Sequence, residues 1–184
     1  MSKPIIITFS GKANHGKNTA VDFLKDLLTQ QGNKVLAINY ADHLKHLATQ
    51  YMGWDGNKDE KGRTLLQLLG TEKVRSRFPN YWIDHVIQLA KIFEGDFDYI
   101  LIGDCRFPNE IKRWEDEKYK VITVFVERKG FESMLNEEQK NHPSEIALND
   151  YTFNFKIKAS SLEELSEAIE MLFKTKIEQL YIGD

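Results

Sequence analysis

Short β-branched runs alternate along the chain with segments whose apolar residues recur at helical spacing. The first run, 4–9 (PIIITF), ends in a Ser-Gly turn, as expected of a buried strand. An amphipathic helix follows it and stops near Gly32. Strands that alternate with helices predict an α/β domain with a mostly parallel sheet. Four more strands are predicted, at 34–40, 98–103, 121–127 and 153–159.

The interval 41–97 is far longer than a simple crossover between two strands requires. It has too few hydrophobic residues for a core of its own, so we expect a helical insertion that covers a substrate. After the last strand, Ser161 and Glu164 form a capping box that begins a C-terminal helix. All 184 residues are expected to form one domain. Within the interval, helices are predicted at 42–52, 63–77 and 81–94, split by a polar loop at 55–62.

Composition and charge narrow the possible partners. Apolar residues make up 41% and charged residues 29%, which is ordinary for a globular protein. The net charge of −3 provides no basic field for nucleic acid polymers or anionic membranes. Cys105 is the only cysteine, so neither an internal disulfide nor a Cys-rich metal site is expected. The apolar start is too short for a signal sequence or a membrane span, which favours a cytoplasmic protein.

The segment 11–19 lies between the first predicted strand and the first predicted helix. It reads G-x-x-x-x-G-K followed by Asn-Thr, and its glycines let successive backbone N–H groups face inward. The start of the helix adds partial positive charge, and Lys17 would reach the β- and γ-phosphates of ATP. This context favours an ATP site over a Gly-rich surface turn. The predicted ATP-binding residues are Gly11, Lys12, Ala13, Asn14, His15, Gly16, Lys17, Asn18 and Thr19.

Three residues are candidates for magnesium or acceptor chemistry. Asn18 stands where such loops usually carry Ser or Thr, and its amide oxygen could ligate Mg²⁺ directly or through water. Asp104, after the third strand, could hold Mg²⁺ through water or accept a proton, and helix capping is its alternative role. Asp42 is either an N-cap for helix 42–52 or a contact to the acceptor.

Arginine placement favours a kinase. A kinase whose acceptor carries a phosphate needs a second anion site, and only six arginines are present. Arg106 and Arg128 follow the third and fourth strands, where ligands of open parallel sheets bind. Surface salt bridges are the alternative role for both. A GTPase is disfavoured because segment 57–60 (NKDE) lacks the final Asp of N-K-x-D and follows no strand, so a solvated turn is expected there.

Several motifs together resemble the bacteriophage deoxynucleoside monophosphate kinases. The resemblance covers roughly 5–150, and R-F-P-N-E with L-L-Q-x-L-G-T is its most specific part. It implies a P-loop NTPase fold, a three-layer α/β/α structure with a five-stranded sheet, a helical acceptor-binding insertion and a lid. The motifs are F-S-G-K-x-x-x-G-K-x-T (9–19), A-D-x-L-K (41–45), G-R-x-L-L-Q-x-L-G-T-E-x-V-R (62–75), Trp82, D-C-R-F-P-N-E (104–110) and H-P-S-E (142–145).

The resemblance also implies roles for individual residues. The acceptor pocket would include Lys12, Asp42, Lys45, Arg63, Gln67, Gly70, Thr71 and Trp82. Arg106, Asn109 and Glu110 would lie beside the transferred phosphate, and Arg128 with a lid at 129–150, including His142, Ser144 and Glu145, would close over it. At helical spacing Trp82 could equally be a core residue.

The implied reaction is ATP- and Mg²⁺-dependent phosphorylation of a deoxynucleoside monophosphate. Lys17, Arg106, Arg128 and Asp104 are the expected catalytic residues. A kinase of a small metabolite, similar to animal phosphomevalonate kinases, and a nonenzymatic nucleotide-binding protein are the alternatives. The base, the sugar and the oligomeric state stay open, with a homodimer possible, and a phage origin would place the enzyme in the host cytoplasm.

Overall fold

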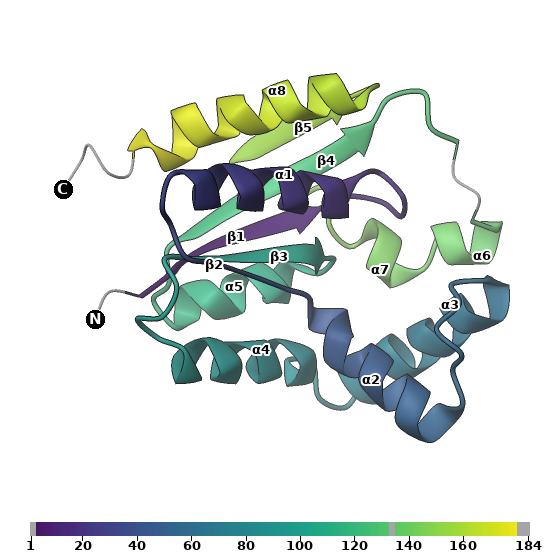
Figure 1. The fold of residues 1–184 in the computed structure, drawn as a ribbon. Coiled ribbons are helices and arrows are strands. Elements are labelled where there is room, and N and C mark those ends of the chain that lie inside the picture. The colour runs from purple at the N-terminus through teal and green to yellow at the C-terminus, as the bar shows by residue number, and fades with distance from the viewer. Residues whose placement is uncertain (1–2, 133–134, 180–184) are drawn as a thin grey trace.

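The computed structural model describes residues 3–132 and 135–179 and contains a five-stranded sheet (Figure 1). The strand order is β2-β3-β1-β4-β5, and every neighbouring pair is parallel, so the predicted sheet is confirmed. All carboxyl ends of the strands therefore lie at one edge. The strands are β1 (Ile5–Ser10), β2 (Val35–Ile38), β3 (Tyr99–Cys105), β4 (Val121–Arg128) and β5 (Phe155–Ala159).

Helices cover both faces of the sheet, which gives the predicted three-layer α/β/α arrangement (Figure 1). On one face lie α1 (Lys17–Gln30), α8 (Leu162–Leu172) and its π-helical extension η2 (Phe173–Ile177). On the other lie α4 (Tyr81–Ile92) and α5 (Pro108–Asp116). Beyond the carboxyl edge are α2 (Tyr40–Met52), α3 (Glu60–Gln67), the π-helix η1 (Leu68–Arg75), α6 (Glu137–Lys140) and α7 (Pro143–Ile146).

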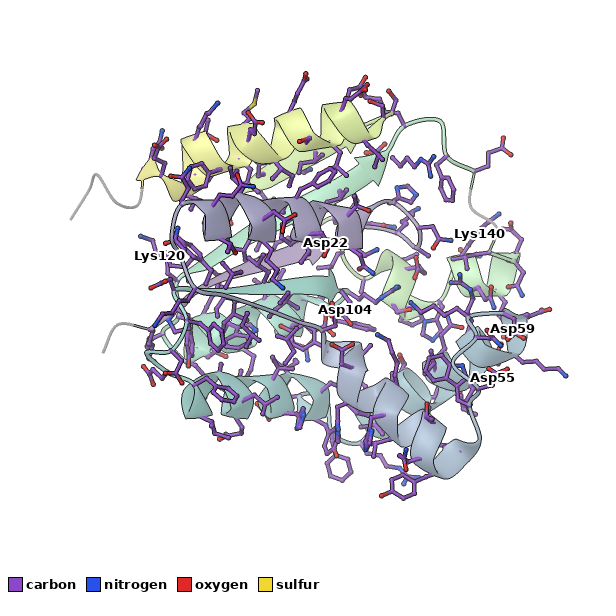
Figure 2. The ribbon with its side chains drawn as sticks, in the orientation of Figure 1. Asp22, Asp55, Asp59, Asp104, Lys120 and Lys140 are labelled. Carbon is purple, nitrogen blue, oxygen red and sulfur yellow. The ribbon has the colours of Figure 1, made fainter. Side chains whose placement is uncertain are left out.

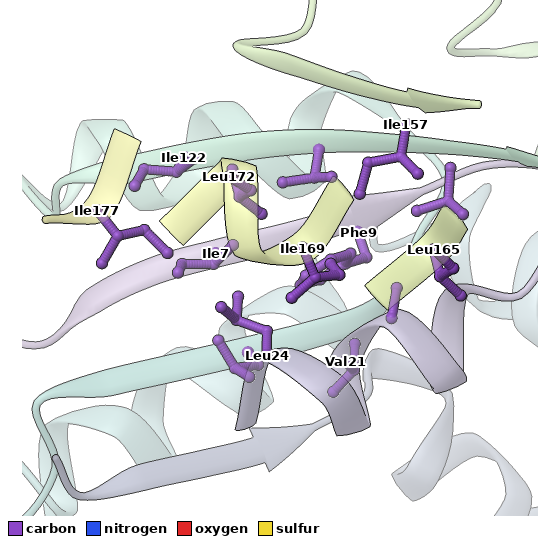
Figure 3. Close-up of a cluster of buried hydrophobic side chains, with 14 of the residues drawn as sticks. Ile7, Phe9, Val21, Leu24, Ile122, Ile157, Leu165, Ile169, Leu172 and Ile177 are labelled. Carbon is purple, nitrogen blue, oxygen red and sulfur yellow. The ribbon is translucent and has the colours of Figure 1, made fainter. Parts of the chain in front are cut away.

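Two buried clusters, one on each face, hold these layers together. On the α1/α8 face, Ile7 and Phe9 of β1 pack with Leu24, Ile169 and Leu172 (Figure 3). These side chains come from strands and helices that the apolar spacing identified. Burial of such side chains contributes about 1.5–3 kcal/mol each relative to exposure.

The opposite cluster shows how the insertion attaches to the sheet. Ile83 and Ile87 of α4 are fully buried with Ile100 and Ile102 of β3. The described part of the insertion therefore shares its buried cluster with the sheet. Its last helix, α4, forms one layer of the fold together with α5, while α2, α3 and η1 extend past the strand ends and can border a ligand.

Several helix and strand boundaries differ from those predicted. The helix predicted at 63–77 starts earlier, at Glu60, because Asp59 accepts a hydrogen bond from the Gly62 N–H at 2.8 Å (Figure 2). It then changes to a π-helix from Leu68, which the apolar spacing does not reveal. Strand β3 runs on to Cys105, so Asp104 lies within the strand and not after it.

Candidate active site

A cavity of about 720 Å³ opens at the carboxyl edge of the sheet. Its volume is within the range of ligand pockets. The phosphate loop borders one part, and the insertion borders another. Many residues expected at the site line it: Ala13, Asn14, His15, Gly16, Lys17, Asn18, Thr19, Lys45, Arg63, Gln67, Gly70, Thr71, Trp82, Asp104, Arg106, Glu110, Arg128, Ser144 and Glu145.

Backbone geometry explains the sequence of the phosphate loop. Gly11 has φ 143°, and a Cβ there would lie 2.3 Å from the carbonyl oxygen of Val126 on β4. Asn14 and Gly16 also have positive φ, 62° and 87°. Gly16 is the N-cap of α1, so the free N–H groups of the first turn of this helix begin at the loop. The loop is thus held against the sheet with a helix N-terminus beside the cavity, an arrangement suited to phosphate.

Lys17 is buried at the base of the loop. Its Nζ donates to the carbonyl oxygens of Gly11 and Lys12, at 2.8 and 2.7 Å. Burial, together with the positive charge of Arg106, which acts in the same direction, lowers the pKa of Lys17 to about 8. An anion placed at the loop would counter both effects and favour the charged amine.

Arg128, at the end of β4, is tied to the loop through its backbone. Its N–H donates to His15 Nδ1 at 3.1 Å, and its guanidinium lies 5.2 Å from the ring of Phe131. Burial and the nearby Lys17 lower the pKa of His15, which favours the neutral ring that accepts this bond. The exposed Arg128 side chain lines the cavity beside β5 and the start of α8.

Asp104 anchors the first insertion helix, as the capping alternative suggested. Its two carboxylate oxygens accept from the N–H groups of Tyr40 and Ala41, both at 2.9 Å (Figure 2). Burial raises the pKa of Asp104, and these two bonds oppose that rise. The start of α2 is therefore fixed to β3 by a carboxylate that also faces the cavity.

Asp42 has a structural role at the same helix. Its carboxylate accepts from the Asn39 N–H at 3.0 Å and pairs with Lys45 at 2.9 Å. Asp42 is the N3 residue of a capping box and does not line the cavity. Gly11, Lys12, Asn109 and His142 also lie outside the lining, and Asn109 instead donates to Pro79 and Asn80.

The first turn of α1 offers oxygen ligands for magnesium. Asn18 is exposed to the cavity, and Thr19 lines it too. Within residues 3–132 and 135–179, no group of three or more His, Cys, Asp or Glu side chains could hold a metal ion. These residues fit an ion bound mainly by water and phosphate oxygens, as Mg²⁺ usually is, with Asn18 adding an amide oxygen.

On the insertion side, Trp82 and Gly70 form a packed wall. The indole N–H of Trp82 donates to the Gly70 carbonyl at 2.9 Å, and only 3% of the residue is exposed. A Cβ on Gly70 would lie 2.8 Å from Leu44 Cδ2 on α2. Trp82 is therefore a core residue that also lines the cavity. The absence of a side chain at Gly70 lets η1 approach α2 closely.

Arg75 and Glu110 form a buried ion pair that the sequence did not predict. The Arg75 Nη2–Glu110 Oε1 distance is 2.6 Å, and Glu110 is 2% exposed. The other oxygen of Glu110 accepts from the N–H groups of Arg106 and Phe107. Arg75 is the last residue of the motif that starts at Gly62, and this position was the only sequence signal for it. Its partner Glu110 lies 35 residues further along the chain.

Lys58 is the second residue that the sequence analysis missed. It lies in an exposed loop before α3, as predicted for a solvated turn, and it also lines the cavity. Burial lowers the pKa of Lys58, and the charges of Lys45 and Arg63 act in the same direction. Three cations therefore lie near one another at the insertion side of the cavity.

Arg106 projects from the end of β3 toward α7. Its Nη1 donates to the Ser144 carbonyl at 3.2 Å and pairs with the Glu145 carboxylate. The other oxygen of Glu145 accepts from the Ala13 N–H at 3.1 Å. Helix α7, near the end of the segment expected to form the lid, therefore contacts both the arginine and the phosphate loop.

Comparison with solved structures finds the same fold in two kinases. Shikimate kinase from Aquifex aeolicus matches with a TM-score of 0.54 and 15% identity, over 98% of this chain and 100% of that one. The APS kinase of Mycobacterium tuberculosis in complex with AMPPNP and APS matches with a TM-score of 0.52 and 10% identity, over 95% and 100%. At these identities the likeness concerns the fold alone.

Sequence comparisons identify no relative. No protein-family model matches the chain, and no curated protein does. Among the described residues, no helix has the length and apolar character needed to cross a membrane. The chain has a three-layer α/β/α fold that it shares with these kinases, and its candidate site lies where the strands end.

Proposed function

We propose that this chain is an ATP-dependent phosphotransferase that phosphorylates a deoxynucleoside 5′-monophosphate to the diphosphate. The observation that carries the proposal is a single cavity with two cationic regions. Lys17 belongs to the phosphate loop, Lys58 belongs to the insertion, and the charge of Arg106 acts on both. Such a cavity suits two anionic substrates with a shared arginine beside both.

The loop side is assigned to ATP. The phosphates would be bound by the N–H groups of segment 11–19 and by Lys17. Arg128 and the residues between β5 and α8 line the cavity next to the loop, where Gly16 approaches Leu165. We place the nucleoside of ATP there, against Ser160, Ser161 and Leu162.

The insertion side is assigned to the acceptor. Lys45, Lys58 and Arg63 supply positive charge for its phosphate. Gln67 and Thr71 can hydrogen-bond a base, and Trp82 and Leu66 provide apolar surface. The resemblance of segment 62–75 to deoxynucleotide kinases favours a nucleotide over other phosphorylated acceptors.

The reaction needs positioning and charge neutralisation more than covalent chemistry. An oxygen of the acceptor phosphate attacks the γ-phosphorus of ATP, and the bond to the β–γ bridging oxygen breaks, which releases ADP. Lys17, Arg106 and Arg128 would stabilise the negative charge on the transferred group. Because the attacking phosphate is already ionised, no strong general base is required. Mg²⁺, held at Asn18 and Thr19 and through water at Asp104, would add charge neutralisation at the phosphates.

A kinase of another small metabolite is the second candidate. Two of the solved structures that match are named as kinases of APS and of shikimate, which supports phosphoryl transfer but does not favour nucleotides as acceptors. The segment 129–150 is proposed as the lid in either case. Its closure would exclude water and suppress hydrolysis of ATP.

The test is ADP formation from ATP and Mg²⁺ with dAMP, dCMP, dGMP, dTMP and each ribonucleoside monophosphate. We expect turnover with at least one deoxynucleotide, well above the ATP hydrolysis seen without an acceptor. A chain that binds ATP and stays inactive with all of these, but phosphorylates phosphomevalonate, would be a metabolite kinase. ATP binding without transfer to any of these acceptors would contradict the proposal and favour a nucleotide-binding protein.

A further inference from the structure

Glu145 is a nearly buried carboxylate between two parts of the candidate active site. Its side chain is 5% exposed, although it belongs to the short helix α7. One oxygen accepts from the Ala13 N–H of the phosphate loop at 3.1 Å, and the other pairs with Arg106 Nη1. A single side chain thus connects the lid, the phosphate loop and the end of β3.

These contacts determine how Arg106 is presented to the cavity. Nη1 is held by both the Ser144 carbonyl and Glu145. Both of these interactions use Nη1, and neither uses Nε or Nη2 of Arg106. A guanidinium held through one nitrogen can direct the other two toward a phosphate in a bidentate arrangement.

The charges nearby explain why a carboxylate is tolerated beside a phosphate site. The negative charge of Glu145 favours the protonated form of Lys17, whereas Arg106 disfavours it. Glu145 therefore reduces the repulsion between two cations that the reaction needs at close range. Without it, Arg106 would be repelled from Lys17 and held to α7 by the Ser144 carbonyl alone.

From this geometry we infer that Glu145 is a positioning residue for phosphoryl transfer. Its carboxylate fixes the position of Arg106 relative to the phosphate loop, because it pairs with Arg106 and accepts from the Ala13 N–H. It does not itself bind the acceptor. The inference rests on the proposed function, and it replaces the contact to substrate that the resemblance implied for this residue. The expected defect on removing Glu145 is therefore in the chemical step and not in acceptor binding.

The first experiment is a double-mutant cycle of Glu145→Gln and Arg106→Ala. Glutamine keeps the size of the side chain and the acceptor for Ala13 but loses the ion pair. We expect E145Q to lower kcat about 100-fold, the order associated with a misplaced catalytic group, while KM for the acceptor changes little. In the R106A background E145Q should have almost no further effect, because the two residues act together.

Two further variants test whether the effect is specific to the charge and length of the Glu145 side chain. Glu138→Gln removes an exposed carboxylate of the same segment and should leave kcat unchanged. Glu145→Asp keeps the charge but shortens the side chain by one methylene, so it should lower kcat as well. Wild-type kcat in E145D or E145Q, a higher kcat in E145Q, or effects of E145Q and R106A that simply multiply would each overturn the inference.

A binding measurement separates this inference from the proposed reaction. If Arg106 is directed at the γ-phosphate, the preference of the wild-type chain for ATP over ADP should fall in E145Q and in R106A alike, measured by calorimetry. This result is expected whichever acceptor the enzyme uses. An unchanged preference in E145Q together with a reduced one in R106A would exclude the positioning role even if no acceptor had been found.

Discussion

At the scale of single residues, Lys17 shows how the fold changes the chemistry of a group that the sequence identifies. Any exposed lysine is charged across the neutral range, but burial in the phosphate loop lowers the pKa of Lys17 to about 8. Its Nζ is already held by the carbonyl oxygens of Gly11 and Lys12. The amine is thus pre-positioned at the loop, and its charge becomes sensitive to pH and to bound anions.

This pKa predicts a pH-dependent affinity for ATP. Below pH 8 Lys17 is already protonated, so affinity should be nearly constant with respect to this group. Above pH 8 binding must take up a proton, and the dissociation constant should rise by up to about tenfold per pH unit. Calorimetric titrations with ATP between pH 6.5 and 10 would measure this change in the dissociation constant. Lys17→Arg, which stays charged, should lack the step, and a flat wild-type profile would contradict the assignment.

The same shift has a consequence for stability. Because the folded pKa is lowered, the unfolded chain binds more protons between pH 8 and the ordinary lysine value of 10.5. The contribution of Lys17 to the free energy of unfolding should therefore increase as the pH rises through that window.

At the scale of elements, the π-helix η1 shapes the acceptor side of the cavity. π-Helical turns are uncommon and often occur at functional sites. Here Gly70 and Thr71, which line the cavity, lie within η1, and Arg75 ends it. The close approach of η1 to α2 depends on the missing side chain at Gly70 and on the position of Leu44.

A Gly70→Ala variant should therefore weaken acceptor binding. The new methyl group would lie 2.8 Å from Leu44 Cδ2 and push η1 away from α2. We expect KM for the acceptor to rise at least about tenfold, because small displacements of a binding wall are costly, while affinity for ATP stays unchanged. Steady-state kinetics would measure both.

The compensating variant tests the cause. Adding Leu44→Ala to Gly70→Ala removes the clashing atoms, so KM should return toward that of the wild type. If G70A leaves KM unchanged, or if the double variant is worse than G70A, the contact between η1 and α2 does not shape the acceptor site.

At the scale of the whole molecule, the insertion and the sheet share one hydrophobic cluster. Trp82 and Ile83 of α4 pack with Ile100 of β3 and Trp114 of α5. Asp104 adds a polar link between β3 and α2. With no core of its own, the insertion has little to stabilise it once the sheet unfolds.

We therefore predict one cooperative unfolding transition for the chain. Urea unfolding followed by tryptophan fluorescence and by far-ultraviolet circular dichroism should give the same midpoint. ATP at about 100 times its dissociation constant should raise the free energy of unfolding by about 2.7 kcal/mol with both probes. An earlier fluorescence transition, reporting Trp54 and Trp82 of the insertion, would show that this region unfolds separately.

The helices, the strands and the phosphate loop could be predicted from the sequence, because they depend on local patterns. A β-branched run, a Gly-rich turn and an amphipathic stripe are properties of neighbouring residues, and the five strands and the loop at 11–19 followed from them. The scarcity of arginine and its occurrence after strand ends likewise indicated Arg106 and Arg128.

The roles of the remaining side chains follow from the folded structure, because their partners are distant in the chain. Asp104 was a magnesium candidate by position, and its oxygens also accept from N–H groups 63 and 64 residues away. Glu145 contacts Ala13 across 132 residues, and the exposed Lys58 also lines the cavity. Such pairings depend on which strand ends meet and on which helices cover them, and no local periodicity encodes that.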